Sequence, residues 1–471
     1  MSSNVSSAFV DIIKSNYNLN WKNYIFGAVV FSVLLFLTFK FNLQFYSLAI
    51  VIGLIYAYLL LYFPKIWLYS VLVLSGVFFN LSSEGLSIFD VLFAGLFIGS
   101  NALWLINKVL LKREKIAHNL GDFLILSFFF LLIFNFVVAF LNNNDLMLWL
   151  REYFMFSIVL IYFPIRDILK DEKDIKSFLK VFAVVVVFCG FYQIYLYYNR
   201  INTDLVYAYE LKHGYNFNQT LYTIASIYGF VFTFFQLKKR DELLSIIFTG
   251  IVVVSLIATF SRTFWVTLAA VIFILFLFFP SKKKVKIVVY LSVILGIFFI
   301  SAYLLMKDNL MIFLEVIINR FTSSAEGKQD LSVVARLMEW TEVIKQIFNQ
   351  PLYGKGLGGK FSFYSVIVTH SLHTDIIHNG YLFILFRAGI PLSLFYFGFI
   401  VFYTIRAYDN LIFTKTGFLR PLAISNLTSI LTMYVVNFTS SQFFYRDGIF
   451  ITSFIVLMIS LNSFLIKKQN K

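Results

Sequence analysis

The sequence has few charged residues and almost no cysteine. Charged residues make up 13% of the 471 residues, whereas a soluble globular domain has roughly a quarter. The single cysteine, Cys189, lies in an apolar run, which rules out an intramolecular disulfide and a cysteine-rich metal site. The opening residues are polar and no small-residue cleavage site follows, so we expect no cleaved signal peptide and a retained first span.

Hydrophobic residues are abundant, at 60% of the chain, and they recur in long runs. Runs of about 20 apolar residues are typical of membrane-spanning helices. Outer-membrane barrels are excluded, because their strands give short alternating segments instead. The net charge of +15 does not indicate nucleic-acid binding, because most lysines lie in short loops between apolar runs.

These runs predict an all-α, polytopic integral membrane protein with about 12–14 transmembrane helices. We count about fourteen spans, the first at 23–39 and the last at 447–466. The predicted organisation has about eleven spans in residues 1–306, one large polar loop at 307–378, and about three spans in 379–471. We expect this loop to contain amphipathic helices and the catalytic groups.

The positions of the basic residues predict the orientation in the membrane. With the N-terminus in the cytoplasm, alternate loops carry lysines and arginines, whereas loops such as 82–85 and 142–145 carry none. This alternation predicts cytoplasmic N- and C-termini and places the loop at 307–378 outside the cytoplasm. Nucleotide-activated substrates, which are cytoplasmic, would therefore not reach this loop.

Several charged residues lie beside or inside the spans, on the side predicted to face outwards. Arg262 follows Ser261 at a tight junction between two spans, and no acidic residue adjoins it. Charges at such places are costly unless they face protein or water, so they indicate function. The pairs Arg151–Glu152 and Arg446–Asp447 can equally be internal salt bridges or interface anchors.

The long polar interval of the chain begins at Arg320 and ends at Gly389. Its segment "LSVVARLMEWTEVIKQIFNQP" has apolar residues at helical spacing and ends at Pro351, which predicts an interfacial amphipathic helix. Arg336 and Trp340 share one face of this helix, and Trp340 is a candidate for stacking on a sugar. The alternative is an amphipathic lid with a structural arginine.

The rest of the interval combines glycines and histidines. "GKGLGGKF", with Gly354 and Gly356, lacks the features of a P-loop and predicts a tight turn with positive φ. His378 lies at the predicted start of the next span, where it can act as a base, bind phosphate or be a simple interface residue. His370 and His373 have the spacing of metal ligands on a helix, but without a completing ligand pattern we expect no metal.

The strings "RLMEW", "LYGKGLGGKF" and "HNGYLFILFRAGI", with "FSRT" about 75 residues before them, resemble the O-antigen ligase and polymerase family of bacterial envelope-glycan enzymes. The resemblance covers roughly residues 255–400. It implies a GT-C-like polytopic glycosyltransferase of the bacterial inner membrane. The implied partners are an undecaprenyl-diphosphate-linked glycan donor, a glycan or lipid A core acceptor, and the lipid bilayer.

The resemblance also implies roles for individual residues. Arg262 and Arg336 would bind the diphosphate and stabilise its charge, and His378 would activate the acceptor hydroxyl or orient the donor, in an inverting transfer without a cofactor or metal. The candidate substrate-binding residues are Arg320, Trp340, Ser261, Asn379, Gly354, Gly356 and Arg151. The stretch between the glycines and His378, with its two histidines, departs from the family pattern.

A second class of function is compatible with a polytopic protein. A transporter or flippase of lipid-linked oligosaccharide or of a small anion would place its charges at mid-membrane, in broken helices of related halves. Here the charges crowd one membrane face, which favours chemistry over passage. The motifs do not separate ligases, which transfer finished glycan, from polymerases, which extend it.

Overall fold

The structure is a computed structural model that describes residues 44–80, 88–203, 218–235, 238–305, 318, 331–367 and 369–469. The predicted span at 23–39 lies outside these residues. Helix α3 (Gln44–Tyr62) belongs to a first unit that ends at Tyr62. The other described elements belong to a second unit, which begins at Phe63.

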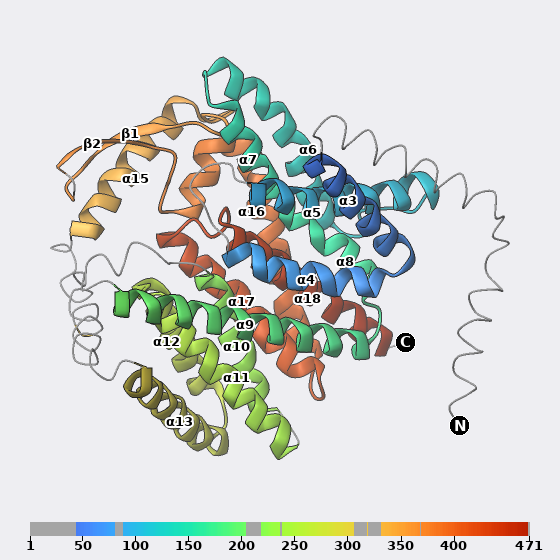
Figure 1. Ribbon diagram of the computed structural model, residues 1–471, viewed down its shortest axis with the longest axis vertical. Coiled ribbons are helices and arrows are strands. Elements are labelled where there is room, and N and C mark those ends of the chain that lie inside the picture. The colour runs from blue at the N-terminus through green and yellow to red at the C-terminus, as the bar shows by residue number, and fades with distance from the viewer. Residues whose placement is uncertain are drawn as a thin grey trace. The chain divides into compact units, whose positions relative to one another are not determined.

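The second unit is almost entirely helical (Figure 1). Its helices before the polar interval are α4 (Pro64–Asn80), α5 (Ile88–Leu105), α6 (Leu120–Leu141), α7 (Leu146–Ser157), α8 (Tyr162–Ile168), α9 (Glu172–Thr203), α10 (Gln219–Thr233), α11 (Lys239–Ile257), α12 (Arg262–Phe278) and α13 (Ser281–Leu305). A π-helical turn (Ile106–Leu111) follows α5, and a 3₁₀ turn (Ile158–Ile161) joins α7 to α8. The later elements are α15 (Leu331–Asn349), β1 (Phe361–Ser365), β2 (His370–Thr374), α16 (Gly380–Phe413), α17 (Leu419–Thr439) and α18 (Arg446–Gln469).

This architecture confirms the predicted all-α, polytopic membrane fold. Among the described residues, six helical segments are long and apolar enough to cross a membrane, and four shorter apolar segments accompany them. Helix α18 lies in the interior, where it packs against α7, α8, α10, α16 and α17 and buries most of its side chains. The total of about 12–14 spans stays a prediction.

Loops that the charge pattern assigned to one side of the membrane meet at one end of the bundle. Lys65 pairs with Asp174 at 2.7 Å, and Lys468 pairs with Asp171 at 2.7 Å. These four residues define what we call the basic end. The opposite set of loops also meets, because Asn144 donates a hydrogen bond to Leu357 O at 2.9 Å.

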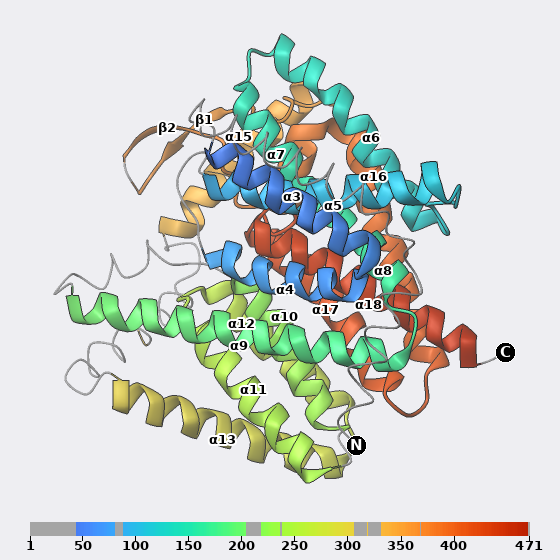
Figure 2. The same ribbon diagram turned by 45° about the vertical axis from the view of Figure 1, so that its right-hand side comes forward.

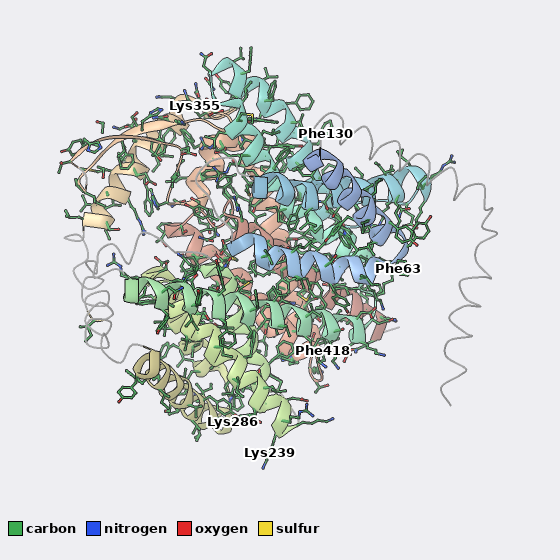
Figure 3. All side chains as sticks on the ribbon, in the orientation of Figure 1. Phe63, Phe130, Lys239, Lys286, Lys355 and Phe418 are labelled. Carbon is green, nitrogen blue, oxygen red and sulfur yellow. The ribbon has the colours of Figure 1, made fainter. Side chains whose placement is uncertain are left out.

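The segment from α15 to the start of α16 defines the second end, which we call the loop end. In two views, α15 and the β1–β2 hairpin lie at one edge of the unit (Figure 2). Lys355, from this segment, lies at the opposite edge of the view from Lys239 and Lys286, which start α11 and α13 (Figure 3). The grouping of loops into two ends therefore follows the predicted alternation, and the cytoplasmic placement of the basic end stays a prediction.

Helix α16 is broken near its first third, where the polar interval ends. Gly389 has φ 75° and ψ 169°, which is not helical, and Pro391 two residues later has no N–H to donate. Such a break leaves backbone groups without partners inside the protein. The turn at 351–359 supplies them: Lys355 N donates to Phe386 O at 2.7 Å, Gly356 N donates to Arg387 O at 3.1 Å, and Ile390 N donates to Pro351 O at 2.8 Å.

The glycines of this turn are required by close packing. Gly354, Gly356 and Gly358 have φ of 67°, 85° and 71°, as the tight turn predicted. A Cβ on Gly358 would lie 2.7 Å from Asp145 O and 2.9 Å from Trp149 N. Only glycine combines this backbone conformation with such an approach.

A buried ion pair connects the turn, the break and the start of α7. The Arg387 side chain is fully buried and its Nη2 lies 2.7 Å from Glu152 Oε1. The same guanidinium donates to Gly359 O and, at 3.0 Å, to Asp375 O, while Glu152 Oε2 accepts from Gly358 N at 2.9 Å. Glu152 thus pairs with Arg387, and the proposed internal pair Arg151–Glu152 is not formed.

The hairpin at 361–374 was not predicted, because short strands that alternate Phe and Ser give little signal within a helical protein. Its strands pair antiparallel, with Ser362 opposite His373 and Ser365 opposite His370. Side chains alternate along a strand, so His370 and His373 lie on opposite faces of β2. Residues three apart share a face on a helix but not on a strand. The spacing of His370 and His373 therefore does not bring the two side chains together as metal ligands.

The first prediction concerns the buried pair. Replacing Arg387 with Ala leaves Glu152 buried without its cation, which costs about 3–5 kcal/mol in comparable buried pairs. We expect a large drop in the melting temperature of the purified protein in detergent. Arg151→Ala is the matched control, because Arg151 forms no ion pair or hydrogen bond with any described residue. Equal melting temperatures for the two variants would contradict this role.

The second prediction concerns the turn. Gly358→Ala combines left-handed strain of about 1–2 kcal/mol with a backbone clash, so we expect marked destabilisation. Gly417 has a similar φ of 74° but open space around its Cβ position, so Gly417→Ala carries the strain alone. Thermal unfolding of both variants measures the difference. If Gly417→Ala destabilises as much as Gly358→Ala, the close packing of the turn is unimportant.

Candidate functional site

Helix α15 positions most of the candidate residues. The predicted amphipathic helix is confirmed at Leu331–Asn349, and Pro351 follows its end. Its buried stripe has four-residue spacing and consists of Ala335, Glu339, Val343 and Ile347. A glutamate within an otherwise apolar stripe is costly to bury unless its oxygens are hydrogen-bonded.

The partner of this glutamate is His378. Glu339 Oε1 accepts a hydrogen bond from His378 N at 2.6 Å, and Glu339 Oε2 lies 2.7 Å from His378 Nδ1. The Glu339 side chain is 2% exposed and that of His378 is 46% exposed. An ionised carboxylate only accepts hydrogen bonds, so in the neutral form of the His378 ring the proton lies on Nδ1 and Nε2 carries the lone pair. No described residue forms a hydrogen bond with Nε2.

The loop before α16 holds His378 from the other side. Asn379 is the N-cap of α16, as its Oδ1 accepts from Tyr381 N and Leu382 N at 3.0 Å each. Its Nδ2 donates to Phe438 O at 3.0 Å. Ser441 Oγ also donates to Ile377 O. His378 thus lies at a helix N-terminus, as predicted, and the Asn379 side chain has a structural role there.

Arg336 and Trp340 lie on α15 beside Glu339. The Trp340 ring contacts Phe438 edge-on, with 5.5 Å between ring centroids, and its buried Nε1 has no hydrogen-bond partner among the described residues. Arg336 is half-buried. Its positive charge acts on Tyr445, a residue of the loop before α18.

Tyr445 lies within reach of the charges of several residues around the His378–Glu339 pair. Desolvation and then the charges of Glu339, Asp447 and Asp375 raise the pKa of Tyr445 to about 12, and Arg336 opposes the rise. The tyrosine is nevertheless 37% exposed at its surface. Tyr445, like any tyrosine at physiological pH, is a neutral phenol that can donate a hydrogen bond, and the influence of Glu339 on it places it close to the His378–Glu339 pair.

The other predicted residues lie elsewhere or in structural positions. Gly354 and Gly356 are buried against backbone atoms of α16 and α6. Arg262 begins α12, directly after Ser261 and after Phe260, whose φ of 54° marks a strained turn. The structure thus confirms the tight junction, but no described contact joins Arg262 to His378. Arg151 is half-buried on α7, and Arg320 lies outside the described residues.

The sequence analysis did not identify Glu339 and Tyr445 as members of the site, nor Arg387 as a buried cation. Glu339 was inside the string "RLMEW", where an acid on the apolar side of an amphipathic helix was the available signal. Arg387 stood alone in the apolar string "LFILFRAGI", which by itself indicates a buried partner. No sequence signal pointed to Tyr445, because only the fold brings it to α15.

No group of three or more His, Cys, Asp or Glu side chains that could hold a metal ion occurs among the described residues. His373 Nδ1 instead lies 2.9 Å from Ser362 Oγ across the hairpin.

Comparison with known proteins identifies one part of the chain. Residues 247–397 match the family described as O-antigen ligase. The match begins within α11 and extends through α15, the hairpin and His378 into α16. Among curated proteins, none matches the chain. Residues 247–397 thus carry the likeness to the O-antigen ligase family, and the chain as a whole is a multi-pass, almost entirely helical membrane protein.

Proposed function

We propose that this protein is a membrane glycosyltransferase of the ligase or polymerase type. It takes glycan from an undecaprenyl-diphosphate-linked donor and transfers it to a glycan or lipid A core acceptor. The reaction takes place at the extracytoplasmic face of the bacterial inner membrane, with both termini in the cytoplasm. The observation that carries this proposal is the pair formed by Glu339 of α15, three residues after Arg336, and His378 of the loop before α16, both within the residues that match the O-antigen ligase family.

In this mechanism His378 is the general base. Its Nδ1 is occupied by Glu339, so Nε2 takes the proton of the acceptor hydroxyl as the oxygen attacks the anomeric carbon. The bond to the diphosphate breaks in the same step. Both oxygens of Glu339 accept hydrogen bonds from His378, so this carboxylate is not placed to act as the nucleophile of a covalent glycosyl intermediate. A single displacement, with inversion, is therefore favoured.

The leaving group is an anion, and the proposed groups that stabilise it are cations. Guanidinium groups match phosphate oxygens in bidentate geometry, so Arg336 and Arg262 bind the diphosphate and stabilise its developing charge. Arg320 joins them from the start of the loop. Tyr445, a neutral phenol, donates a hydrogen bond to the same oxygens or to the sugar. Trp340 and Arg151 contact the glycan.

The third prediction tests these roles. Purified Arg336→Ala, Arg262→Ala and His378→Ala each lower transfer in detergent by about 100-fold or more, because each removes a group that acts in the transition state. Lys345→Ala is the control on α15, since Lys345 is exposed and Glu342, at 3.4 Å, is its only ion-pair partner in the described part of the chain. Full activity in all three variants would overturn the proposed function.

The same assay distinguishes enzyme from transporter. Detergent solution has no compartments, so formation of a new glycosidic bond there cannot result from transport. In cells, the glycan ladder of a deletion strain separates the two enzyme types. A single repeat unit on the lipid core indicates a lost polymerase, and polymer left on the carrier lipid indicates a lost ligase.

The fourth prediction concerns metal. Arginines provide the positive charge that Mg²⁺ supplies in many phosphate-transfer sites. We expect the rate of transfer to change by less than about twofold when EDTA is added, since fixed side chains carry that charge. An EDTA-sensitive rate that Mg²⁺ or Mn²⁺ restores would contradict the metal-independent mechanism.

A further inference from the structure

We propose that Glu339 is the positioning residue of this reaction, which sets the tautomer and the direction of the His378 ring. This inference rests on the proposed function, because it assigns the base role to His378. It goes further by making that role depend on a second residue, which does not touch the substrate.

Among the described residues, the Glu339 carboxylate forms hydrogen bonds with His378 alone. Glu339 is 2% exposed, and each of its two oxygens accepts a hydrogen bond from His378. The bond from the main-chain N–H, at 2.6 Å, fixes where residue 378 lies. The bond from Nδ1, at 2.7 Å, fixes how its ring is turned. An anchor for the loop would need only the first of these bonds.

The second bond has a chemical consequence. Because the carboxylate accepts from Nδ1–H, the Nε2 lone pair faces away from Glu339, on the half-exposed side of the ring. When Nε2 takes a proton from the acceptor hydroxyl, the ring becomes positively charged. The adjacent carboxylate stabilises this imidazolium without itself accepting the proton.

Glu339→Gln provides a sharp test. Glutamine has the same shape but one oxygen and one NH₂ group. Its oxygen accepts from His378 N, so the NH₂ group faces Nδ1, which must then be the acceptor. The proton moves to Nε2, and the ring can no longer act as a base.

The fifth prediction follows from this tautomer change. In the purified full-length protein, Glu339→Gln lowers kcat by about 100-fold or more, while KM for the lipid-linked donor changes less than about twofold. Glu339→Asp, which is shorter but accepts only, retains more activity than Glu339→Gln. Glu342→Gln on the same helix is the control and stays at the rate of the unchanged protein, since among the described residues the Glu342 carboxylate forms hydrogen bonds only with Lys345 and Gln346.

A merely structural role gives a different pattern. If packing alone mattered, the isosteric Gln would be tolerated better than the shorter Asp, and this order would overturn the inference. An effect on KM alone, or a kcat within about threefold of the unchanged protein, would overturn it as well. If Glu339→Gln is active while His378→Ala is inactive, only this inference fails. If His378→Ala is fully active, the base role of His378 fails and this inference fails with it.

Discussion

The buried Arg387–Glu152 pair is the interaction on which the loop end depends. A guanidinium with no exposed surface is stable inside a membrane protein only when acceptors surround it, and here Glu152, Gly359 O and Asp375 O provide them. These acceptors come from α7, from the glycine turn and from the stretch before His378. One side chain thus joins three segments that are far apart along the chain.

The His378–Glu339 pair closes a ring of contacts that begins at Arg387. In one direction the glycine turn leads back through Pro351 to α15, and so to Glu339. In the other direction the chain from Arg387 back to Asn379 is the first part of α16. The two paths meet where Glu339 accepts from His378. The distance between His378 and Glu339 is therefore set by the hydrogen-bonded break in α16 and the turn packed against it.

Much of the fold was predictable, because a segment that crosses a lipid bilayer must be long, apolar and internally hydrogen-bonded. Long apolar runs gave helices such as α6, α17 and α18, and Pro351 and the glycines gave the end of α15 and a positive-φ turn. The site was predictable in part: His378 lies at the predicted helix start and Arg262 at the predicted junction. The hairpin, the break at Gly389 and the partners Glu339 and Glu152 were not, since each depends on contacts between distant segments.

A helical membrane protein with one polar segment rich in arginine, histidine and glycine can be predicted from the amino-acid sequence alone. Apolar length and the cost of unpaired backbone groups in lipid act locally, so they can be read along the chain. Which charged residues pair with each other depends on the tertiary structure. Glu339 pairs with His378, 39 positions away, and Glu152 pairs with Arg387, 235 positions away. Such pairings are chosen by the burial that the complete fold imposes, because a buried charge is stable only beside its partner.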